Sequence, residues 1–328
     1  MKIRIKKSFT VLFIILICVP YNEINSKNIS TNDSKIKNED IQQEITKFAS
    51  FNPNFGIISD MIIIDDLILL AAQGLIILNI SDIKNPKFVT RINEKITYLC
   101  IDYNNSLLAL GSNDLFDLFN ISNIINPFFI TRYQYPGEYT DIIIERNILW
   151  CIRNNHFIEC FKFMNSEIIR ETSRYVNYIQ TLFLFKKYIL APTRDYGIYF
   201  LNLTTFQVER IFYPDISILD FCFEENLGYI ISFTTINVIN MTNIYEITTL
   251  KSISLNYLSN VQIKSDICFL NRIIYPSTIS TITILNMTNL NNISEISQYN
   301  TTIAGIDLIV GGDFCVLFAE NIGLEIIN

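Results

Sequence analysis

The sequence predicts an all-β protein, a seven-bladed β-propeller built from four-stranded antiparallel blades. Three observations carry this prediction: a motif that recurs about every forty residues, short apolar strands separated by polar turns, and a last repeat that lacks its fourth strand. Self-similarity of this kind is typical of architectures in which each unit is one small sheet.

The repeat is clearest from Gly74 to Ile92, which reads GLIILNISDIKNPKFVTRI. An apolar strand leads into an Asn-Ile-Ser turn, an Asn-Pro pair and a second strand. The equivalent turn positions, separated by 38 to 46 residues, are Asn79, Asn120, Lys162, Asn202, Asn240, Asn286 and Asn328.

Four strands can be read in each unit. The first unit places them at Gly56–Ile63, Leu67–Ala72, Gly74–Ile80 and Lys87–Ile92, and the second at Ile96–Asp102, Leu107–Gly111, Leu115–Ile121 and Phe128–Tyr133. The third strands are apolar on both faces, as in a strand covered by neighbouring sheets. The fourth strands mix polar and apolar residues, which is typical of an outer strand with one wet face.

The last unit offers only three strands, near Ile303–Ile309, Phe314–Phe318 and Leu324–Ile327. Residues 43–50, QEITKFAS, are similar to the fourth strand of the fifth unit, EITTLKS. We therefore expect residues 43–50 to complete the seventh blade, so that residues 43–328 form one closed propeller without exposed inner edges.

The N-terminal region precedes the repeats. Residues 1–26 begin with basic side chains, continue with an apolar run from Val11 to Val19 and end in polar residues, the pattern of a secretory signal peptide. Cys18 leaves open a lipid anchor, and the apolar run leaves open an uncleaved anchor. Residues 27–42 are too polar to bury a core and predict a flexible leader.

Charge and hydropathy restrict the partners. The net charge of −7 disfavours nucleic acid. No apolar run reaches the ~20 residues that a membrane-spanning helix needs, so we expect no transmembrane helix in the mature chain. The sequence therefore predicts a secreted or cell-surface protein whose partner is an extracellular protein or glycan.

The cysteines give little sign of a disulfide framework. Outside the signal peptide they lie within apolar strand patterns at Cys100, Cys151, Cys160, Cys222, Cys268 and Cys315. Buried free thiols are the expected state. The one alternative is a disulfide between Cys151 and Cys160 across a hairpin.

The stretch GLIILNISDIKNPKFV resembles the LVIVD repeat, which has a Gly-led apolar strand, an Asp-x-Ser turn and an Asn-Pro. The match is close in the first two units, through Asn85-Pro86 and Asn126-Pro127, and weaker afterwards. The resemblance implies a β-propeller on the outside of a bacterial or archaeal cell and brings no catalytic residues with it. Here Asn replaces the Asp of the turn.

Aspartates recur in the innermost strands. Aligning these strands places Asp60, Asp141, Asp220, Asp266 and Asp307 at one position, where Cys100 and Gln180 stand in the other two units. Five carboxylates near one channel could bind calcium, because hard cations prefer clustered oxygen ligands. The alternative, which we favour, is that each Asp accepts hydrogen bonds from backbone amides of a neighbouring blade. No other cofactor is expected.

Asn-x-Ser/Thr triplets recur at the ends of the third strands, headed by Asn79, Asn120, Asn202, Asn240 and Asn286. In an exported chain these are glycosylation acceptors, and all five would lie on one face. The same side chains are also suited to an Asx turn, and the two roles are compatible.

Known catalytic patterns are absent from the sequence. His156 is the single histidine, and no phosphate loop, CxxC pair or GxSxG elbow occurs. The sequence favours a binding or scaffolding module over an enzyme. It would present the loops around residues 52–56, 94–96, 135–139, 194–196, 214–216, 256–260 and 300–303. The alternatives are a hydrolase or lyase with acids at the channel mouth, with or without calcium, and a structural surface-layer component.

Overall fold

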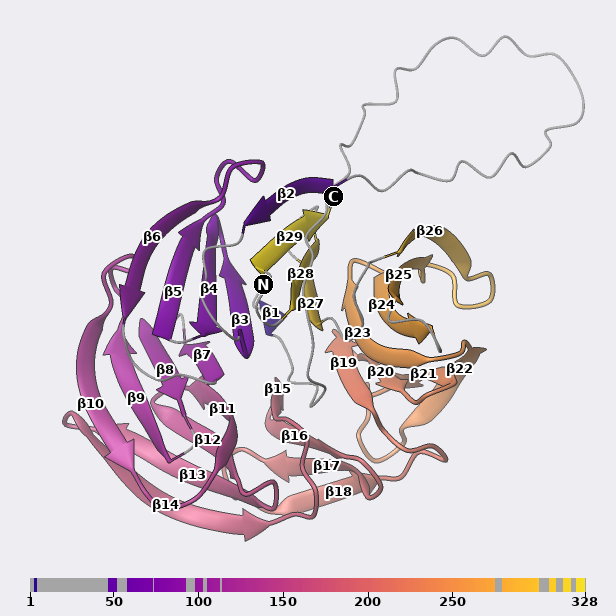
Figure 1. Cartoon of the computed structure of the whole chain (residues 1–328). Helices are drawn as coiled ribbons and strands as arrows, with labels where there is room; N and C mark the ends of the chain where they lie inside the picture. The colour runs from indigo at the N-terminus through magenta and orange to yellow at the C-terminus, as the bar shows by residue number, and fades with distance from the viewer. Residues whose placement is uncertain are drawn as a thin grey trace, which may run out of the picture.

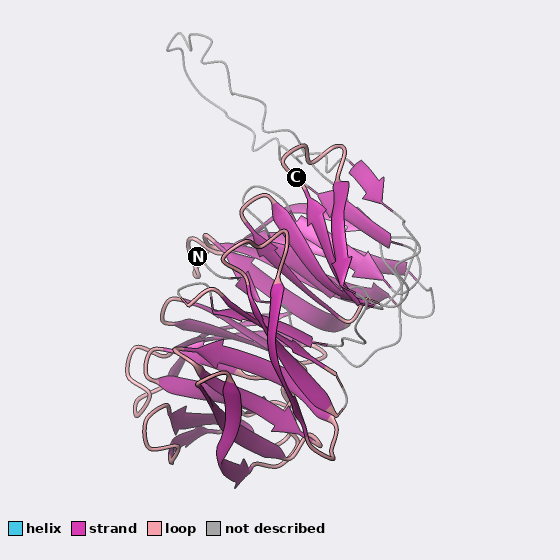
Figure 2. Ribbon diagram, turned by 90° about the vertical axis from the view of Figure 1, so that its left-hand side faces the viewer, coloured by secondary structure: helices cyan, strands magenta, loops and turns pink. Residues whose placement is uncertain are grey.

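A computed structural model describes residues 3–4, 47–51, 58–72, 74–92, 98–102, 105–112, 114–274, 279–300, 307–310, 315–319 and 323–327. Strands and loops make up this part of the chain (Figure 2). Apart from Ile3 and Arg4, the predicted signal peptide 1–26 and leader 27–42 lie outside the described residues. Among the residues that are described, no helix is long and apolar enough to cross a membrane.

The described strands form antiparallel sheets in a β-propeller arrangement, and we number the sheets in chain order. Sheet 1 contains β1 (Ile3–Arg4), β3 (Asp60–Ile64), β4 (Leu67–Ala72), β5 (Gly74–Asn79) and β6 (Lys87–Ile92). Sheet 2 contains β7 (Tyr98–Asp102), β8 (Leu107–Gly111), β9 (Leu115–Asn120) and β10 (Phe128–Gln134). Sheet 3 contains β11 (Tyr139–Glu145), β12 (Ile148–Arg153), β13 (Phe157–Met164) and β14 (Glu167–Tyr175).

The second half of the chain continues in the same way. Sheet 4 contains β15 (Phe183–Phe185), β16 (Tyr188–Thr193), β17 (Gly197–Asn202) and β18 (Val208–Phe212). Sheet 5 contains β19 (Asp220–Glu224), β20 (Leu227–Ile231), β21 (Thr235–Asn240) and β22 (Thr248–Ser254). Sheet 6 contains β23 (Leu258–Lys264), β24 (Ile267–Ile274), β25 (Ile279–Asn286) and β26 (Ser294–Asn300). Sheet 7 contains β27 (Asp307–Val310), β28 (Cys315–Ala319), β29 (Gly323–Ile327) and β2 (Lys47–Phe51).

Six of these sheets have four strands, whereas sheet 1 has five, because β1 pairs with β3. The sheets follow one another around a centre, with the fourth strands β6, β10, β14, β18, β22 and β26 on the outside (Figure 1). First strands of neighbouring sheets contact one another at several boundaries: β3 with β7, β7 with β11, β19 with β23, β23 with β27, and β27 with β3. The sheet of the last repeat therefore lies beside the sheet of the first.

The last sheet is completed by a strand from the other end of the chain. β2 pairs antiparallel with β29, from Lys47 opposite Ile327 to Phe51 opposite Leu324. This is the pairing that the sequence predicts for residues 43–50. Residues 43–46 lie outside the described part, and the described strand runs from Lys47 to Phe51.

Every pairing of a third with a fourth strand contains a β-bulge at the same place. The fourth strand carries one residue without a partner directly opposite it: Phe48, Val89, Ile130, Glu171, Glu209, Leu250 and Ile296. Bulges bend a strand and increase its local twist. This feature is not evident from the sequence.

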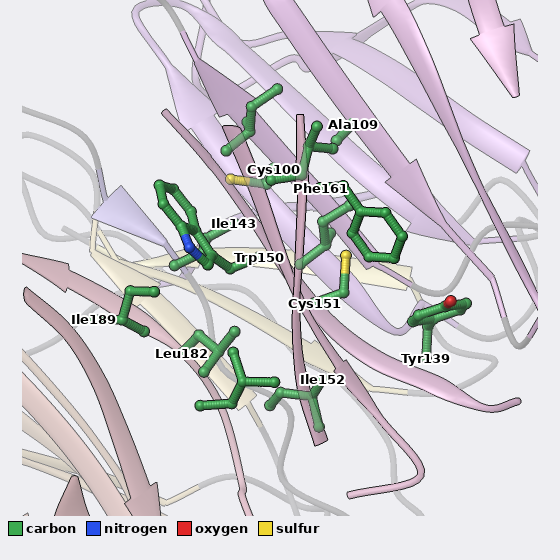
Figure 3. Packing of buried hydrophobic residues seen from close by; sticks show 14 of the residues in the cluster. Cys100, Ala109, Tyr139, Ile143, Trp150, Cys151, Ile152, Phe161, Leu182 and Ile189 are labelled. Carbon is green, nitrogen blue, oxygen red and sulfur yellow. The ribbon is translucent and has the colours of Figure 1, made fainter. Parts of the chain in front are cut away.

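The core lies between neighbouring sheets. Third strands such as β5 are buried along most of their length, whereas fourth strands such as β14 are exposed or half-buried. The largest cluster joins sheets 2, 3 and 4 and includes Trp150, Phe161 and Leu182 (Figure 3). Apolar side chains on both faces of the inner strands thus hold consecutive sheets together.

Glycine at the start of the third strand has a steric reason. Gly74 and Gly197 have φ angles of 125° and 84°, which disfavour other residues. A Cβ atom at these positions would collide with the carbonyl oxygens of Ile92 and Phe212 in the adjacent fourth strands. Glycine at the start of the third strand therefore lets this strand approach the backbone of the fourth strand closely.

The proposed disulfide between Cys151 and Cys160 is not formed, because the two side chains lie on opposite faces of sheet 3. Cys151 is opposite Glu159, and Cys160 is opposite Trp150. Residues directly opposite share a face, and neighbours along a strand do not. Trp150 and Cys151 accordingly point to opposite sides of β12 (Figure 3). The described cysteines, Cys100, Cys151, Cys160, Cys222 and Cys268, are all free thiols.

Candidate functional site

The recurring aspartates join neighbouring sheets. Asp60 accepts hydrogen bonds from the amides of Met61 in its own strand and Leu99 in sheet 2, both at 2.9 Å. Its carboxylate is buried beside the start of β3. Because both oxygens accept amide hydrogens, backbone groups of two sheets stabilise the negative charge.

Asp141 and Asp220 repeat this arrangement. Asp141 accepts the hydroxyl hydrogen of Thr181 and the amide hydrogen of Leu182, both at 2.8 Å and both from the segment directly before β15 of sheet 4. Asp220 accepts the amide hydrogen of Val261 in sheet 6 at 2.9 Å. These contacts match the alternative to a calcium site, in which each carboxylate accepts hydrogen bonds from a neighbouring sheet and holds two sheets together.

Asp266 does not belong to this set, and the alignment that placed it there was wrong. It lies exposed in the turn between β23 and β24, with a φ angle of 61°. Asn260 holds the aspartate position instead, because it lies opposite Asn271 as Asp220 lies opposite Ile231. Asp307 is the first residue of β27, and its side chain lies outside the described part.

Further residues, which the sequence did not single out for this role, also bridge neighbouring sheets. Asp102 in sheet 2 accepts the amide hydrogen of Arg146 in sheet 3 at 2.7 Å. Glu224 in sheet 5 accepts the amide hydrogens of Ser265 and Asp266 in sheet 6. Each carboxylate ends a first strand and reaches the next sheet's first turn.

Gln180 also joins two sheets, but its side chain donates hydrogen bonds instead of accepting them. Its Nε2 donates to the carbonyl oxygens of Ile218 and Leu219, directly before β19 of sheet 5, at 3.1 and 3.3 Å. Side chains of the first strands, or of the residues just before them, thus form hydrogen bonds with the backbone of the next sheet at each boundary from sheet 1 to sheet 6. Within the described ranges, no three His, Cys, Asp or Glu residues are grouped so that they could hold a metal ion.

The five repeated asparagines form Asx turns. In each, Oδ1 accepts the amide hydrogen of the residue two positions later, as in Asn120 with Ser122 at 2.8 Å. The other four are Asn79, Asn202, Asn240 and Asn286. The turns lie between third and fourth strands, at one end of the sheets, and the glycosylation of these residues stays a prediction.

Large aromatic side chains gather at the opposite end of the sheets. Second strands turn into third strands there, and fourth strands lead to the next sheet. The side chains, between 38% and 64% exposed, are Tyr135, Tyr175, Tyr178, Tyr196, Tyr213, Phe233 and Tyr257, which we call the aromatic face. Exposed apolar groups gathered in this way mark interaction surfaces.

An ion-pair network supports one edge of the aromatic face. Arg153 and Arg170 both contact Oε1 of the fully buried Glu159, at 2.8 and 2.5 Å, and Tyr139 donates to Oε2 at 3.3 Å. Burial and the Glu159 carboxylate raise the pKa of Tyr139. Both guanidinium groups lie over the Tyr135 ring, at 5.7 and 5.5 Å, and fix its orientation.

His156 belongs to the same end of sheet 3, in the hairpin between β12 and β13. Its ring stacks on Tyr175 at 5.8 Å and meets Tyr178 edge-on at 4.8 Å. The amide of Tyr178 donates to its Nδ1 at 3.4 Å. These contacts give the histidine a structural role in holding two exposed tyrosines.

The loops that the sequence predicts to be exposed for binding include part of the aromatic face. The loops 135–139, 194–196 and 256–260 contain Tyr135, Tyr196 and Tyr257. The loops 52–56 and 94–96 lie outside the described residues. The aromatic content itself was missed, although one or two aromatic residues stand at these turns in sheets 3, 4 and 5.

Comparison with known proteins identifies the fold but no family. The structure is similar to the crystal structure of the computationally designed Ika8 protein, with a TM-score of 0.61 and 10% sequence identity. The similarity covers 85% of this chain and 98% of that chain. No protein-family model matches the sequence, and no curated protein does.

Proposed function

We propose that this protein is a secreted or cell-surface β-propeller that binds an extracellular protein or glycan through the aromatic face. The observation that carries the proposal is the gathering of seven exposed aromatic side chains at one end of the sheets. Tyrosine and other aromatic residues are enriched where proteins bind partners, because they bury a large area at a small entropic cost.

The surroundings of the aromatic face agree with a binding role. Arg153, Arg170 and His156 hold Tyr135, Tyr175 and Tyr178 in place, so part of the surface is preorganised. The inner carboxylates of Asp60, Asp141 and Asp220 accept amide hydrogens. These contacts give the three carboxylates a structural role between sheets, so they do not argue for a site on the channel axis.

The export signal that the sequence predicts in residues 1–26 and the resemblance to the LVIVD repeat support the extracellular location. We propose also that sheet 1, despite its additional strand β1, is a blade like the others, which makes seven. Its bulge between Ile77 and Leu78 matches the bulges of the four-stranded sheets. An experimental structure with six blades would contradict this count.

Cross-linking of the protein to the surface of its source cells tests the binding role. We expect peptides from residues 175–178, 213 and 233 to carry the cross-links. A variant with Tyr213→Ser and Phe233→Ser should lose them, whereas Phe88→Ser with Phe128→Ser, which alters exposed rings on outer strands, should keep them. Equal loss in both variants would contradict the proposal.

A further inference from the structure

Asn202, at the end of β17, differs from the other four repeated asparagines in what its amide nitrogen contacts. Its Nδ2 donates a hydrogen bond to Oε1 of Glu209 at 2.5 Å. Its Oδ1 accepts the amide hydrogens of Thr204 and Thr205 at 2.8 and 3.1 Å. Both ends of the side-chain amide are therefore engaged within the turn that leads from β17 to β18.

The Glu209 carboxylate is itself held in place by two tyrosines. Its Oε2 accepts the hydroxyl hydrogens of Tyr188 at 3.2 Å and Tyr245 at 2.9 Å. Tyr188 is buried in β16 of the same sheet, whereas Tyr245 belongs to the turn between β21 and β22 of sheet 5. The hydrogen bond from Asn202, followed by that from Tyr245, lowers the pKa of Glu209. The carboxylate is thus charged at neutral pH and fixed beside Nδ2 of Asn202.

The length of the turn in sheet 4 explains why a carboxylate stands here. Glu209 is the bulge residue of β18 and follows Asn202 by seven residues. In sheets 1, 2, 5 and 6 the bulge residue follows the asparagine by ten, so the turn of sheet 4 is three residues shorter. The bulge residues of those four sheets are apolar and offer no side-chain acceptor: Val89, Ile130, Leu250 and Ile296.

The other four asparagines keep their amide nitrogen unengaged. Oδ1 of Asn120 accepts the amide hydrogen of Ser122 at 2.8 Å, and no described residue accepts a hydrogen bond from its Nδ2. The same holds, within the described ranges, for Asn79, Asn240 and Asn286. Asn120 is exposed, while these three and Asn202 are half-buried. Asn120 and Asn202 are thus the most open and the most restricted of the five.

We propose that the folded protein is glycosylated at Asn120 and that the contact with Glu209 keeps Asn202 unmodified. In the modification, Nδ2 forms a bond to the anomeric carbon of an activated sugar, a glycosyl diphosphate. The bond from that carbon to the diphosphate oxygen breaks, the diphosphate leaves with the electron pair, and one Nδ2 proton passes to a base of the transferase. Nδ2 of Asn202 is withheld from this step, because it already donates to a charged acceptor.

The inference goes beyond the proposed binding function. The turns that hold Asn120 and Asn202 lie at the opposite end of the sheets from the aromatic face. A glycan at Asn120 therefore leaves the aromatic face free, and binding there stands or fails independently of the modification.

Transfer of a sugar to the two sites in vitro tests the inference. The full protein, made in a host without N-glycosylation, is incubated with a soluble transferase that moves glucose from UDP-glucose to Asn-x-Ser/Thr triplets. Peptide mass spectrometry gives the rate at each site. We expect Asn202 to react about tenfold more slowly than Asn120 or slower still, the effect of a hydrogen bond to a charged group. Synthetic peptides of residues 116–126 and 198–208, which lack the Glu209 contact, should react at similar rates.

Glu209→Val gives β18 the bulge residue that sheet 1 has, Val89, and should raise the rate at Asn202 towards that of Asn120. Tyr245→Phe is the matched control variant, because it removes one hydrogen bond to Oε2 but keeps the contact with Asn202, which should stay unreactive. Thermal unfolding checks that both variants are folded. Equal rates at the two sites of the folded protein, a slow Asn202 in folded Glu209→Val, or a glycan on Asn202 in protein from the source cells would overturn the inference.

Discussion

At the scale of residues, the innermost carboxylates show how a buried charge can be tolerated. Asp141 lies between two sheets, where an unpaired carboxylate would be costly, and accepts three hydrogen bonds. Two of these come from the neighbouring sheet. The side chain therefore fixes the distance and orientation of one sheet relative to the next.

Replacement of Asp141 by alanine should destabilise the protein by about 2–3 kcal/mol, because two amide hydrogens and one hydroxyl lose a charged acceptor. Urea unfolding measures the effect. The control is Asp195→Ala, which removes an exposed acceptor of the Ser217 hydroxyl. A loss as large for Asp195 as for Asp141 would contradict the bridging role.

The repeated asparagines allow turn formation to be separated from glycosylation. Asn120→Asp keeps the acceptor oxygen that binds the Ser122 amide but removes the glycosylation triplet. We expect unchanged stability and loss of any glycan mass at this site in protein from the source cells. Asn120→Ala should lose the turn as well and cost about 1 kcal/mol. Intact-mass spectrometry and thermal unfolding together distinguish the two variants.

The thiol of Cys160 should react slowly. Burial, followed by the nearby Glu171 carboxylate, raises its pKa to about 11. Below that pH the thiol stays protonated, and only the thiolate is a nucleophile. Labelling of Cys160 with a disulfide reagent should therefore increase about tenfold per pH unit from pH 8 to 10 in the folded protein. A labelling rate that levels off near pH 9 would show an ordinary thiol.

At the scale of elements, strand types and positions were largely predictable from the sequence. Strands such as Leu67–Ala72, Lys87–Ile92 and Leu107–Gly111 have the predicted bounds, because apolar runs end at turn residues. The error at Asp266 arose because the spacing of one unit was misread, so a turn residue was aligned with a strand residue. The aromatic face was not foreseen, since its members come from different loops and only the sheet order brings them together.

The bulges could not be predicted either. Each inserts one residue into a fourth strand, which changes the register without changing the apolar pattern of the third strand. β2 contains the same feature, since Lys47 and Ala49 lie opposite consecutive residues of β29. The strand from the N-terminal region is thus equivalent to the fourth strands of the other sheets.

Removal of β2 should be costly. A chain that begins at Asn52 loses the backbone hydrogen bonds to β29 and exposes its edge, and we expect a loss of about 3 kcal/mol or more. A chain that begins at Gln43 keeps β2 and is the matched control. Equal melting temperatures for the two chains, measured by calorimetry, would show that the pairing contributes little.

At the scale of the whole molecule, the contacts between sheets predict a single cooperative unfolding transition. Bridging side chains and apolar clusters connect consecutive sheets, so one sheet cannot unfold without exposing its neighbours. This distinguishes the protein from an open array, in which terminal repeats unfold separately.

The single tryptophan makes this prediction testable. Trp150 is buried in sheet 3, whereas Asp220 joins sheets 5 and 6. In Asp220→Ala, the midpoints followed by Trp150 fluorescence and by far-ultraviolet circular dichroism should move together to lower urea concentration. A fluorescence midpoint that stays in place while the circular dichroism midpoint moves would show independent unfolding of sheets.

The bulge repeated on the fourth strands has a consequence for the protein at high concentration. A regular, flat rim would offer each molecule a template on which another chain could add a strand, the first step towards fibres. Here the extra residue twists every rim strand away from flatness. The repeated bulge thereby protects the rim strands against strand-to-strand polymerisation.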